Sequence, residues 1–245
     1  MHRETVLTQM RQMRLSAMAD SLEQRLANGD HQNLSHEEFL SLLISDEYSA
    51  RSNRKLSRMI GRANFKPEQA CMENIKYHDS RGFKKMDMMQ FTNATWIRNC
   101  QNIVLTGPTG CGKTYIAEAI ALQACKLGFP AVKKRFRILF EEIHEAKGTG
   151  MYLKYLKKLE GVKVLVIDDF IMNDVDIADL NDLMDIIELR EQIASLIITT
   201  QYPTDKWHLR LPDPTIADAI CDRIVHGAYQ FNLKGASMRK RKSND

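Results

Sequence analysis

Cysteine patterns, long apolar runs and net charge are weakly represented in this chain of 245 residues, and each shortage excludes a class of protein. The five cysteines are scattered, odd in number and without CxxC spacing, which argues against a disulfide framework and a zinc cluster. No run approaches the roughly twenty apolar residues that span a bilayer, and the N-terminus has no apolar signal segment. We therefore expect a cytoplasmic protein with no membrane partner. Because the net charge of +4 is mild, an argument for nucleic-acid binding must rest on where basic residues cluster.

What the chain does contain is enough apolar sequence for one α/β core, at 44% hydrophobic residues, and one specific motif. The stretch from Gly107 to Thr114 reads Gly-Pro-Thr-Gly-Cys-Gly-Lys-Thr and satisfies the GxxxxGKT phosphate-binding pattern. An apolar run at 103–105 precedes it, and an amphipathic segment from Lys113 to about Leu127 follows it. A strand therefore enters the loop and a helix leaves it, a context that disfavours an ordinary glycine-rich turn.

A loop of this kind binds the phosphates of a nucleotide. Glycines let backbone N–H groups converge on phosphate oxygens, and the helix N-terminus adds its positive end. Lys113 is expected to reach the β and γ phosphates of ATP, and Thr114 to ligate Mg²⁺, the only metal expected. The predicted nucleotide contacts are Gly107, Pro108, Thr109, Gly110, Cys111, Gly112, Lys113, Thr114 and Tyr115.

A second apolar run, at 164–167, ends in Asp168-Asp169. This is typical of a buried parallel strand that presents carboxylates at its C-terminal end. Asp168 is expected to hold Mg²⁺ through water, and Asp169 to polarise the attacking water. An acidic turn is the alternative for the pair alone, but its place some fifty residues after the phosphate loop favours a Walker B strand.

A third apolar run, at 196–198, ends in Thr199-Thr200-Gln201. Polar side chains at this edge of an open α/β sheet lie where ligands bind, so Thr200 or Gln201 is a candidate to contact the γ-phosphate or the attacking water. A strand end with turn-forming polar residues is an equal alternative.

The N-terminal part reads as helical. Apolar residues from Leu7 to Leu22 predict one amphipathic helix that stops near Asn28-Gly29, and Ser35 with Glu38 predicts a capping box that opens a second helix. Between Pro67 and Asn102 the pattern is irregular and indicates a linker that docks on the core, with Trp96 and Ile97 beneath the first core strand.

The second predicted helix becomes basic towards its end, where no Asp or Glu occurs. Offsets of three, four and seven place most of the cations on one face, which could meet successive phosphates of a nucleic acid. The alternative is a solvated helix end whose cations complement the helix dipole. The row consists of Arg51, Arg54, Lys55, Arg58, Arg62 and Lys66.

Further basic residues were weighed one by one. The run at 133–137 is expected just after the second core strand, and we hypothesise that Lys134 and Arg135 lie along DNA inside an oligomer; a strand edge guarded by solvated cations is the alternative. Arg223 and Arg239 could stabilise charge on the transferring phosphoryl group, although isolated arginines are usually solvated or in ion pairs.

Together these residues resemble the IstB family, ATP-binding helper proteins of insertion-sequence transposition in the AAA+ superfamily, similar to DnaC-type helicase loaders. The likeness extends over essentially the whole chain and is most specific from Trp207 to Lys240. The segments that carry it are 107–114, 168–169, 199–203, 207–208, 213–226 and 233–240.

The resemblance implies an α/β fold: a P-loop NTPase core of AAA+ type, with a parallel sheet flanked by helices. A small all-α module (1–66) precedes it, a linker (67–101) docks on it, and the core (102–245) ends in a short basic tail without a helical lid. It also implies an ATP-dependent homo-oligomer that assembles on double-stranded DNA, bends or marks it and stimulates a partner transposase. Arg223 matches the position of a trans-acting arginine finger, and Arg239 the sensor-2 position.

Two departures from the family pattern qualify these implications. Phe170-Ile171-Met172 stands where a glycine usually follows the Walker B acids, which leaves the path of that loop open. The second acid is Asp169 instead of a longer Glu, so a slow, DNA-stimulated ATPase is expected. A DnaC-like replicative helicase loader and a small-molecule phosphotransferase remain as alternatives, and the basic row has no purpose in the latter.

Overall fold

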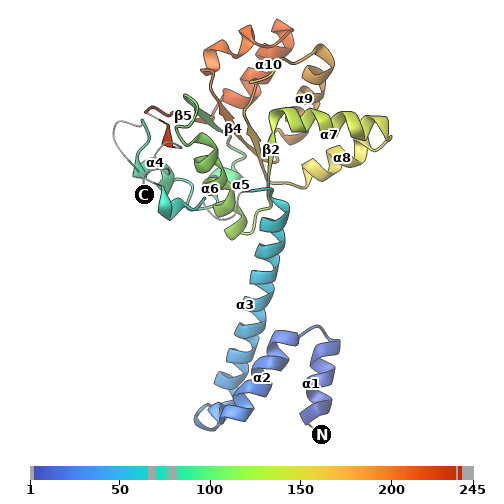
Figure 1. Ribbon diagram of the computed structural model, residues 1–245. Coiled ribbons are helices and arrows are strands. Elements are labelled where there is room, and N and C mark those ends of the chain that lie inside the picture. The colour runs from blue at the N-terminus through green and yellow to red at the C-terminus, as the bar shows by residue number, and fades with distance from the viewer. Residues whose placement is uncertain (1–2, 66–69, 76, 78–81, 236, 239–245) are drawn as a thin grey trace. The chain divides into compact units, whose positions relative to one another are not determined.

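The computed structural model describes residues 3–65, 70–75, 77, 82–235 and 237–238, which form two compact units (Figure 1). One unit reaches to Arg58 and the other begins at Met59. This division lies within a helix, ahead of the module end expected at residue 66. No helix in the described ranges is long and apolar enough to cross a bilayer.

The first unit is helical. It contains α1 (Arg3–Gln12), α2 (Ser16–Asn28), the 3₁₀ helix η1 (Asp30–Asn33) and most of α3 (His36–Arg62). Two sequence signals are confirmed. Gly29 ends α2 in the left-handed conformation, and Ser35 and Glu38 form the capping box, with the Ser35 N–H donating to the Glu38 carboxylate over 2.8 Å.

The single helix expected from Leu7 to Leu22 is wrong, because the chain forms two helices there. Arg14 adopts φ of +60°, and the N–H groups of Arg14 and Leu15 donate to the carbonyls of Arg11 and Met10. This pairing is a Schellman motif, which ends a helix through a left-handed residue that is usually glycine. With arginine in that position, the sequence carried no stop signal.

The second unit is built on a five-stranded parallel sheet in the order β2-β3-β4-β1-β5. Two of the three inner strands, β3 and β4, are buried throughout, as their apolar runs predict. The strands are β1 (Ile103–Thr106), β2 (Ala131–Arg135), β3 (Val164–Asp168), β4 (Ser195–Thr200) and β5 (Tyr229–Asn232).

The helix predicted after the phosphate loop is confirmed as α6, and further helices lie around the sheet (Figure 1). The α-helices after α3 are α4 (Lys85–Met89), α5 (Thr95–Arg98), α6 (Lys113–Lys126), α7 (Phe136–Gly148), α8 (Tyr152–Glu160), α9 (Ile177–Arg190) and α10 (Pro214–Val225). Two 3₁₀ helices, η2 (Met72–Asn74) and η4 (Thr204–Leu209), complete the described elements.

The basic run at 133–137 does not follow the second strand, as the sequence suggested, but lies within it and opens the next helix. Lys133 points inwards and forms a buried ion pair with Glu118 of α6. That pair supplies the compensation a buried lysine needs, which is why a charged residue fits in β2.

Aromatic contacts join the segment before the sheet to β5. The ring centroid of Phe91 lies 5.2 Å from that of Tyr229, and Phe83 lies 5.2 Å from Phe231. Trp96 and Ile97 are buried, as expected. Since parallel strands all end at one edge, this sheet brings the phosphate loop, Asp168 and the end of β4 to the same place.

Candidate nucleotide-binding site

The phosphate loop joins β1 to α6 and depends on glycine at two close approaches. Gly107 has φ of +140° and Gly110 has φ of +84°, in the region that side chains rarely adopt. A Cβ at Gly107 would collide with the carbonyl oxygen of Leu233, and one at Gly110 would collide with Ser237. The loop is therefore shaped against residues that follow β5.

Lys113 is held at the loop by neutral acceptors. Its ammonium donates to the carbonyls of Gly107, over 2.8 Å, and Pro108, over 2.9 Å, and the residue is only 7% exposed. A phosphate oxygen is a stronger acceptor for an ammonium than a carbonyl, so a nucleotide can replace these contacts. The remaining loop residues predicted to contact the nucleotide, Thr109, Cys111 and Gly112, belong to the same turn.

Thr114 and Asp168, the two residues predicted to hold Mg²⁺, are in contact. The Thr114 hydroxyl donates to Asp168 Oδ1 over 2.8 Å, and Asp168 is buried at 3% exposure. A hydroxyl and a carboxylate are oxygen donors of the kind that Mg²⁺ prefers, so these residues fit that ion. Both lie at the C-terminal edge of the sheet.

Thr199 is a site residue that sequence reasoning missed. Its hydroxyl donates to Asp168 Oδ1 over 2.5 Å and accepts from the N–H of Asp169 over 3.2 Å. The signal lay in strand order, since β3 and β4 are neighbours and Ile167 pairs with Ile198, one residue before this contact. Sequence spacing alone does not contain that pairing.

Thr200 is not brought to this cluster. It is fully buried, and its hydroxyl donates to the carbonyl of Phe170 over 2.9 Å. Adjacent residues of a strand point to opposite faces, so Thr199 facing Asp168 directs Thr200 elsewhere. The Thr200 hydroxyl therefore makes a structural hydrogen bond here, and its contact with the γ-phosphate stays a prediction.

The loop after the two acids follows a path that the sequence left open. Asp169 and Ile171 adopt φ of +59° and +51°, and Phe170 between them is buried against Phe136 and Trp207, with ring centroids 4.9 and 4.7 Å away. These contacts impose a left-handed conformation that costs about 1–3 kcal/mol per residue. Asp169 stays exposed.

Asp169 shares a groove with one of the predicted DNA contacts. The groove has a volume of about 340 Å³, and its lining includes Arg135, Asp169 and Asn173. Arg135 is exposed at the end of the edge strand β2. Lys134, in contrast, is half-buried and forms an ion pair with Glu142, with 2.7 Å from Nζ to Oε2.

Tyr115 turns away from the phosphate loop. Its side chain is half-buried and forms a hydrogen bond with the backbone of Cys71, and burial raises the pKa of its hydroxyl. The side chain therefore contacts the segment before the sheet. Arg239 lies outside the described residues.

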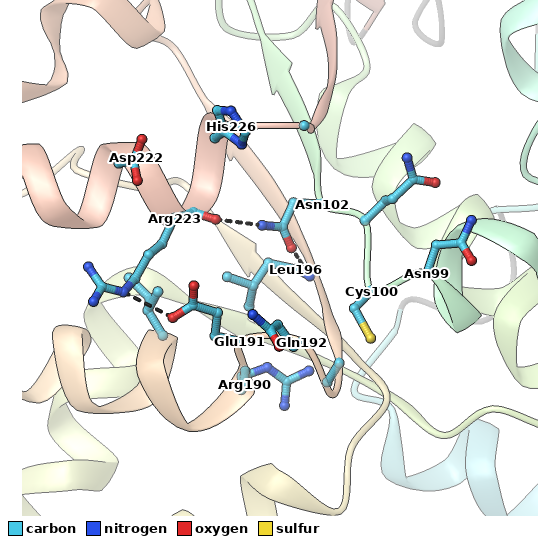
Figure 2. A pocket seen from close by; sticks show the side chains of 14 residues that line it. Asn99, Cys100, Asn102, Arg190, Glu191, Gln192, Leu196, Asp222, Arg223 and His226 are labelled. Atoms are coloured by element: carbon cyan, nitrogen blue, oxygen red, sulfur yellow. Dashed lines mark hydrogen bonds and ion pairs between the residues drawn. The ribbon is translucent and has the colours of Figure 1, made fainter.

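Arg223 lies at the opposite edge of the sheet from the phosphate loop. The Asn102 amide, directly before β1, donates to the carbonyl of Arg223 over 3.1 Å, and its oxygen accepts from the N–H of Leu196 in β4 over 2.9 Å (Figure 2). Both contacts are at the start of the strands. Arg223 therefore cannot reach a nucleotide on the loop of its own chain.

The basic row on α3 divides into two groups. Arg51 and Arg54 bind the buried carboxylate of Glu47, with N–O distances of 2.7 and 3.4 Å. Lys55, Arg58 and Arg62 are exposed and form no ion pair with any residue that the structure describes. Lys66 lies outside the described residues.

Solved structures share this fold. The DnaC helicase loader matches with a TM-score of 0.60 and 19% identity, covering 67% of this chain and 97% of that one. Domain III of the Thermotoga maritima replication initiation protein DnaA matches with a TM-score of 0.60 and 16% identity, covering 74% of this chain and 73% of that one. The second unit thus has the P-loop fold of AAA+ proteins.

Sequence relatives extend over nearly the whole chain. An insertion sequence ATP-binding protein of Sinorhizobium fredii is 34% identical over 234 residues, covering 96% of this chain and 95% of the relative. The ATP-binding protein of insertion sequence IS1162 from Pseudomonas fluorescens is 34% identical over 198 residues, covering 81% of this chain and 86% of the relative. The family model of IstB-like ATP binding proteins matches residues 8–245. With its phosphate loop and paired acids in one AAA+ sheet, the chain belongs to the IstB-like ATP-binding proteins of insertion sequences.

Proposed function

We propose that this protein is an ATP-dependent DNA-binding helper of transposition. It assembles as a homo-oligomer on double-stranded target DNA, remodels or marks that DNA, hydrolyses ATP and stimulates a partner transposase. One observation carries the proposal: the nucleotide cluster and Arg223 lie at opposite edges of one sheet. A chain built this way completes its site only with a second copy.

The residues of the cluster have separate roles in the proposed reaction. Lys113 exchanges the carbonyls of Gly107 and Pro108 for phosphate oxygens, and Asp169 orients and polarises the attacking water. Thr114 and Asp168 would hold Mg²⁺, which neutralises charge on the phosphates when bound. The short Asp169 side chain keeps hydrolysis slow, because it reaches less far than a glutamate.

Arg223 acts in trans in this proposal. A guanidinium presented to the γ-phosphate of a neighbouring subunit stabilises the charge that develops as the phosphoryl group leaves. Hydrolysis then requires assembly, so ATP turnover reports on the oligomer.

DNA contacts fall to the exposed cations that form no ion pair within the described part of the chain. Lys55, Arg58 and Arg62 present one helical row to phosphates, and Arg135 adds a cation beside Asp169. Arg51, Arg54 and Lys134 are already paired with carboxylates and contribute less.

The test combines two defective variants, each of which retains one half of the shared site. Arg223→Ala and Asp169→Asn should each bind ATP but hydrolyse it at least about tenfold more slowly than wild type. Mixed at equal concentration with duplex DNA, they should regain part of the turnover, measured as phosphate release. Replacing Asp169→Asn in the mixture by the double variant Asp169→Asn with Arg223→Ala should give no recovery, because neither subunit then supplies the arginine.

If the mixture releases phosphate no faster than the sum of the two variants measured alone, Arg223 does not act in trans. A rate of ATP turnover that does not change when duplex DNA is added would instead favour a phosphotransferase. The DnaC-like fold also keeps a helicase loader as an alternative. Pull-down of a hexameric helicase, but not of a transposase, would decide for the loader.

A further inference from the structure

All three nitrogens of the Arg223 guanidinium have partners within the chain. Nε lies 3.1 Å from the carboxylate of Glu191, one terminal nitrogen lies 3.2 Å from that of Glu188, and the other donates to the Ala219 carbonyl over 3.3 Å. Figure 2 shows Arg223 turned towards Glu191. Two negative charges therefore face the single positive charge that the proposed hydrolysis requires.

The ends of α9 and α10 hold Arg223 beside the two glutamates. Glu188 is in the last turn of α9, Glu191 follows that helix directly, and Arg223 is in the last turn of α10. Glu191 and Arg223 line one groove of about 320 Å³, which also includes Asn102, Arg190 and His226 in its lining.

The ion pairs are weak enough to exchange. The side chains of Glu188 and Glu191 are 51% and 47% exposed, and exposed ion pairs contribute little net stability. A phosphate dianion on a neighbouring subunit offers stronger charge-assisted hydrogen bonds to the same nitrogens. The contacts can therefore be replaced without unfolding either helix.

We propose that Glu188 and Glu191 form a latch that occupies Arg223 in the free subunit and releases it only to a triphosphate presented by a second copy of this chain. The latch rests on the proposed function, since it has a purpose only if Arg223 acts between subunits. It makes each new subunit contact conditional on bound ATP: a neighbour without the γ-phosphate has nothing to exchange for the two carboxylates. The latch thereby raises the protein concentration at which hydrolysis begins.

The experiment measures ATP turnover at saturating ATP over a series of protein concentrations. The double variant Glu188→Gln with Glu191→Gln keeps the side-chain shapes but removes both charges. It should reach half of its maximal specific activity at a protein concentration about two- to tenfold lower than wild type. Its maximal rate should equal that of wild type, because Arg223 itself is intact.

A matched control removes two charges elsewhere. Glu145→Gln with Glu160→Gln changes two exposed glutamates on α7 and α8 and should leave the concentration dependence unchanged. In an Arg223→Ala background the latch variant should not alter the ATP-dependent assembly midpoint, measured by sedimentation. Thermal unfolding of each variant checks that the fold is kept.

Two results would overturn the latch. One is an unchanged concentration dependence in the latch variant. The other is a maximal rate as low as that of Arg223→Ala, which would show that the glutamates position the arginine for catalysis. If Arg223→Ala hydrolysed ATP like wild type, the proposed trans site would fail and the latch with it.

Discussion

The hydroxyl of Thr199 connects the two acids of the site, since it donates to the Asp168 carboxylate and accepts from the Asp169 backbone. It fixes the orientation of a carboxylate that would otherwise rotate among its partners. Orienting groups of this kind commonly affect activity by about ten- to a hundredfold. Thr200, one residue on, makes its hydrogen bond to a carbonyl away from the cluster.

We therefore expect Thr199→Val to reduce ATP turnover at least about tenfold while ATP affinity changes little, because Lys113 and the loop are untouched. Thr200→Val removes a hydroxyl of the same size and is the control. It should cost about 1–3 kcal/mol in the free energy of unfolding but retain most of the turnover. Equal losses of turnover in the two variants would show that Thr199 has no special role.

The residues of the phosphate loop were predictable because they are consecutive in the sequence and match a known pattern. Gly107 to Thr114 and the pair Asp168-Asp169 could be assigned without a structure, and Thr114 and Asp168 do meet. Thr199 could not, since its role depends on which strand lies beside β3. The exposed or buried state of Lys134 likewise depends on Glu142, which comes from the following helix.

Among the elements, the break between α1 and α2 is the clearest departure from the periodicity. Arg14 takes the left-handed position of the motif that ends α1, and it is exposed. The left-handed conformation costs a residue with a Cβ about 1–2 kcal/mol, whereas glycine adopts it without that cost. The apolar spacing continues through the break because α1 and α2 both contribute to one small hydrophobic core, in which Leu7, Met10 and Ala19 are buried.

Replacement of this residue tests the motif. Arg14→Gly should raise the free energy of unfolding by up to about 1 kcal/mol, measured by denaturant titration of the full chain. Gln9→Gly, at an exposed position inside α1, should lower it by about 1 kcal/mol, since glycine weakens a helix interior. A loss of stability in both variants would argue against the left-handed assignment.

The order of the strands explains why β2 and β5 were harder to predict from the sequence than β1, β3 and β4. The inner strands are buried on both faces and show as apolar runs, whereas β2 and β5 form the edges. β2 carries three consecutive basic residues, and β5 alternates between half-buried and exposed residues. Edge strands lack the long apolar signal, so the basic run appeared to follow the second strand.

For the molecule as a whole, charge placement matters more than the net charge of +4. The cations of α3 that carry the DNA hypothesis are those that form no ion pair with a carboxylate among the residues that the structure describes. Sequence alone gave all six cations of the row equal weight, because the buried Glu47 that binds Arg51 and Arg54 lies outside the row and its orientation requires the fold.

Charge reversal separates these cations. Arg58→Glu should weaken duplex binding and reduce the slope of log affinity against log salt concentration by about 1, as loss of a phosphate contact requires. Lys154→Glu makes the same change on the exposed side of α8 and should leave the slope unchanged. An unaltered slope for Arg58→Glu would remove this residue from the DNA interface.

The packing of Leu233 and Ser237 on the phosphate loop has a consequence for synthesis. At roughly 5–20 residues per second, the ribosome needs on the order of ten seconds to proceed from the loop to these later residues. During that interval the nascent chain contains the whole GxxxxGKT motif but not the segment that shapes it. The contacts that Leu233 and Ser237 make with the loop can therefore form only after the last strand of the sheet has been made.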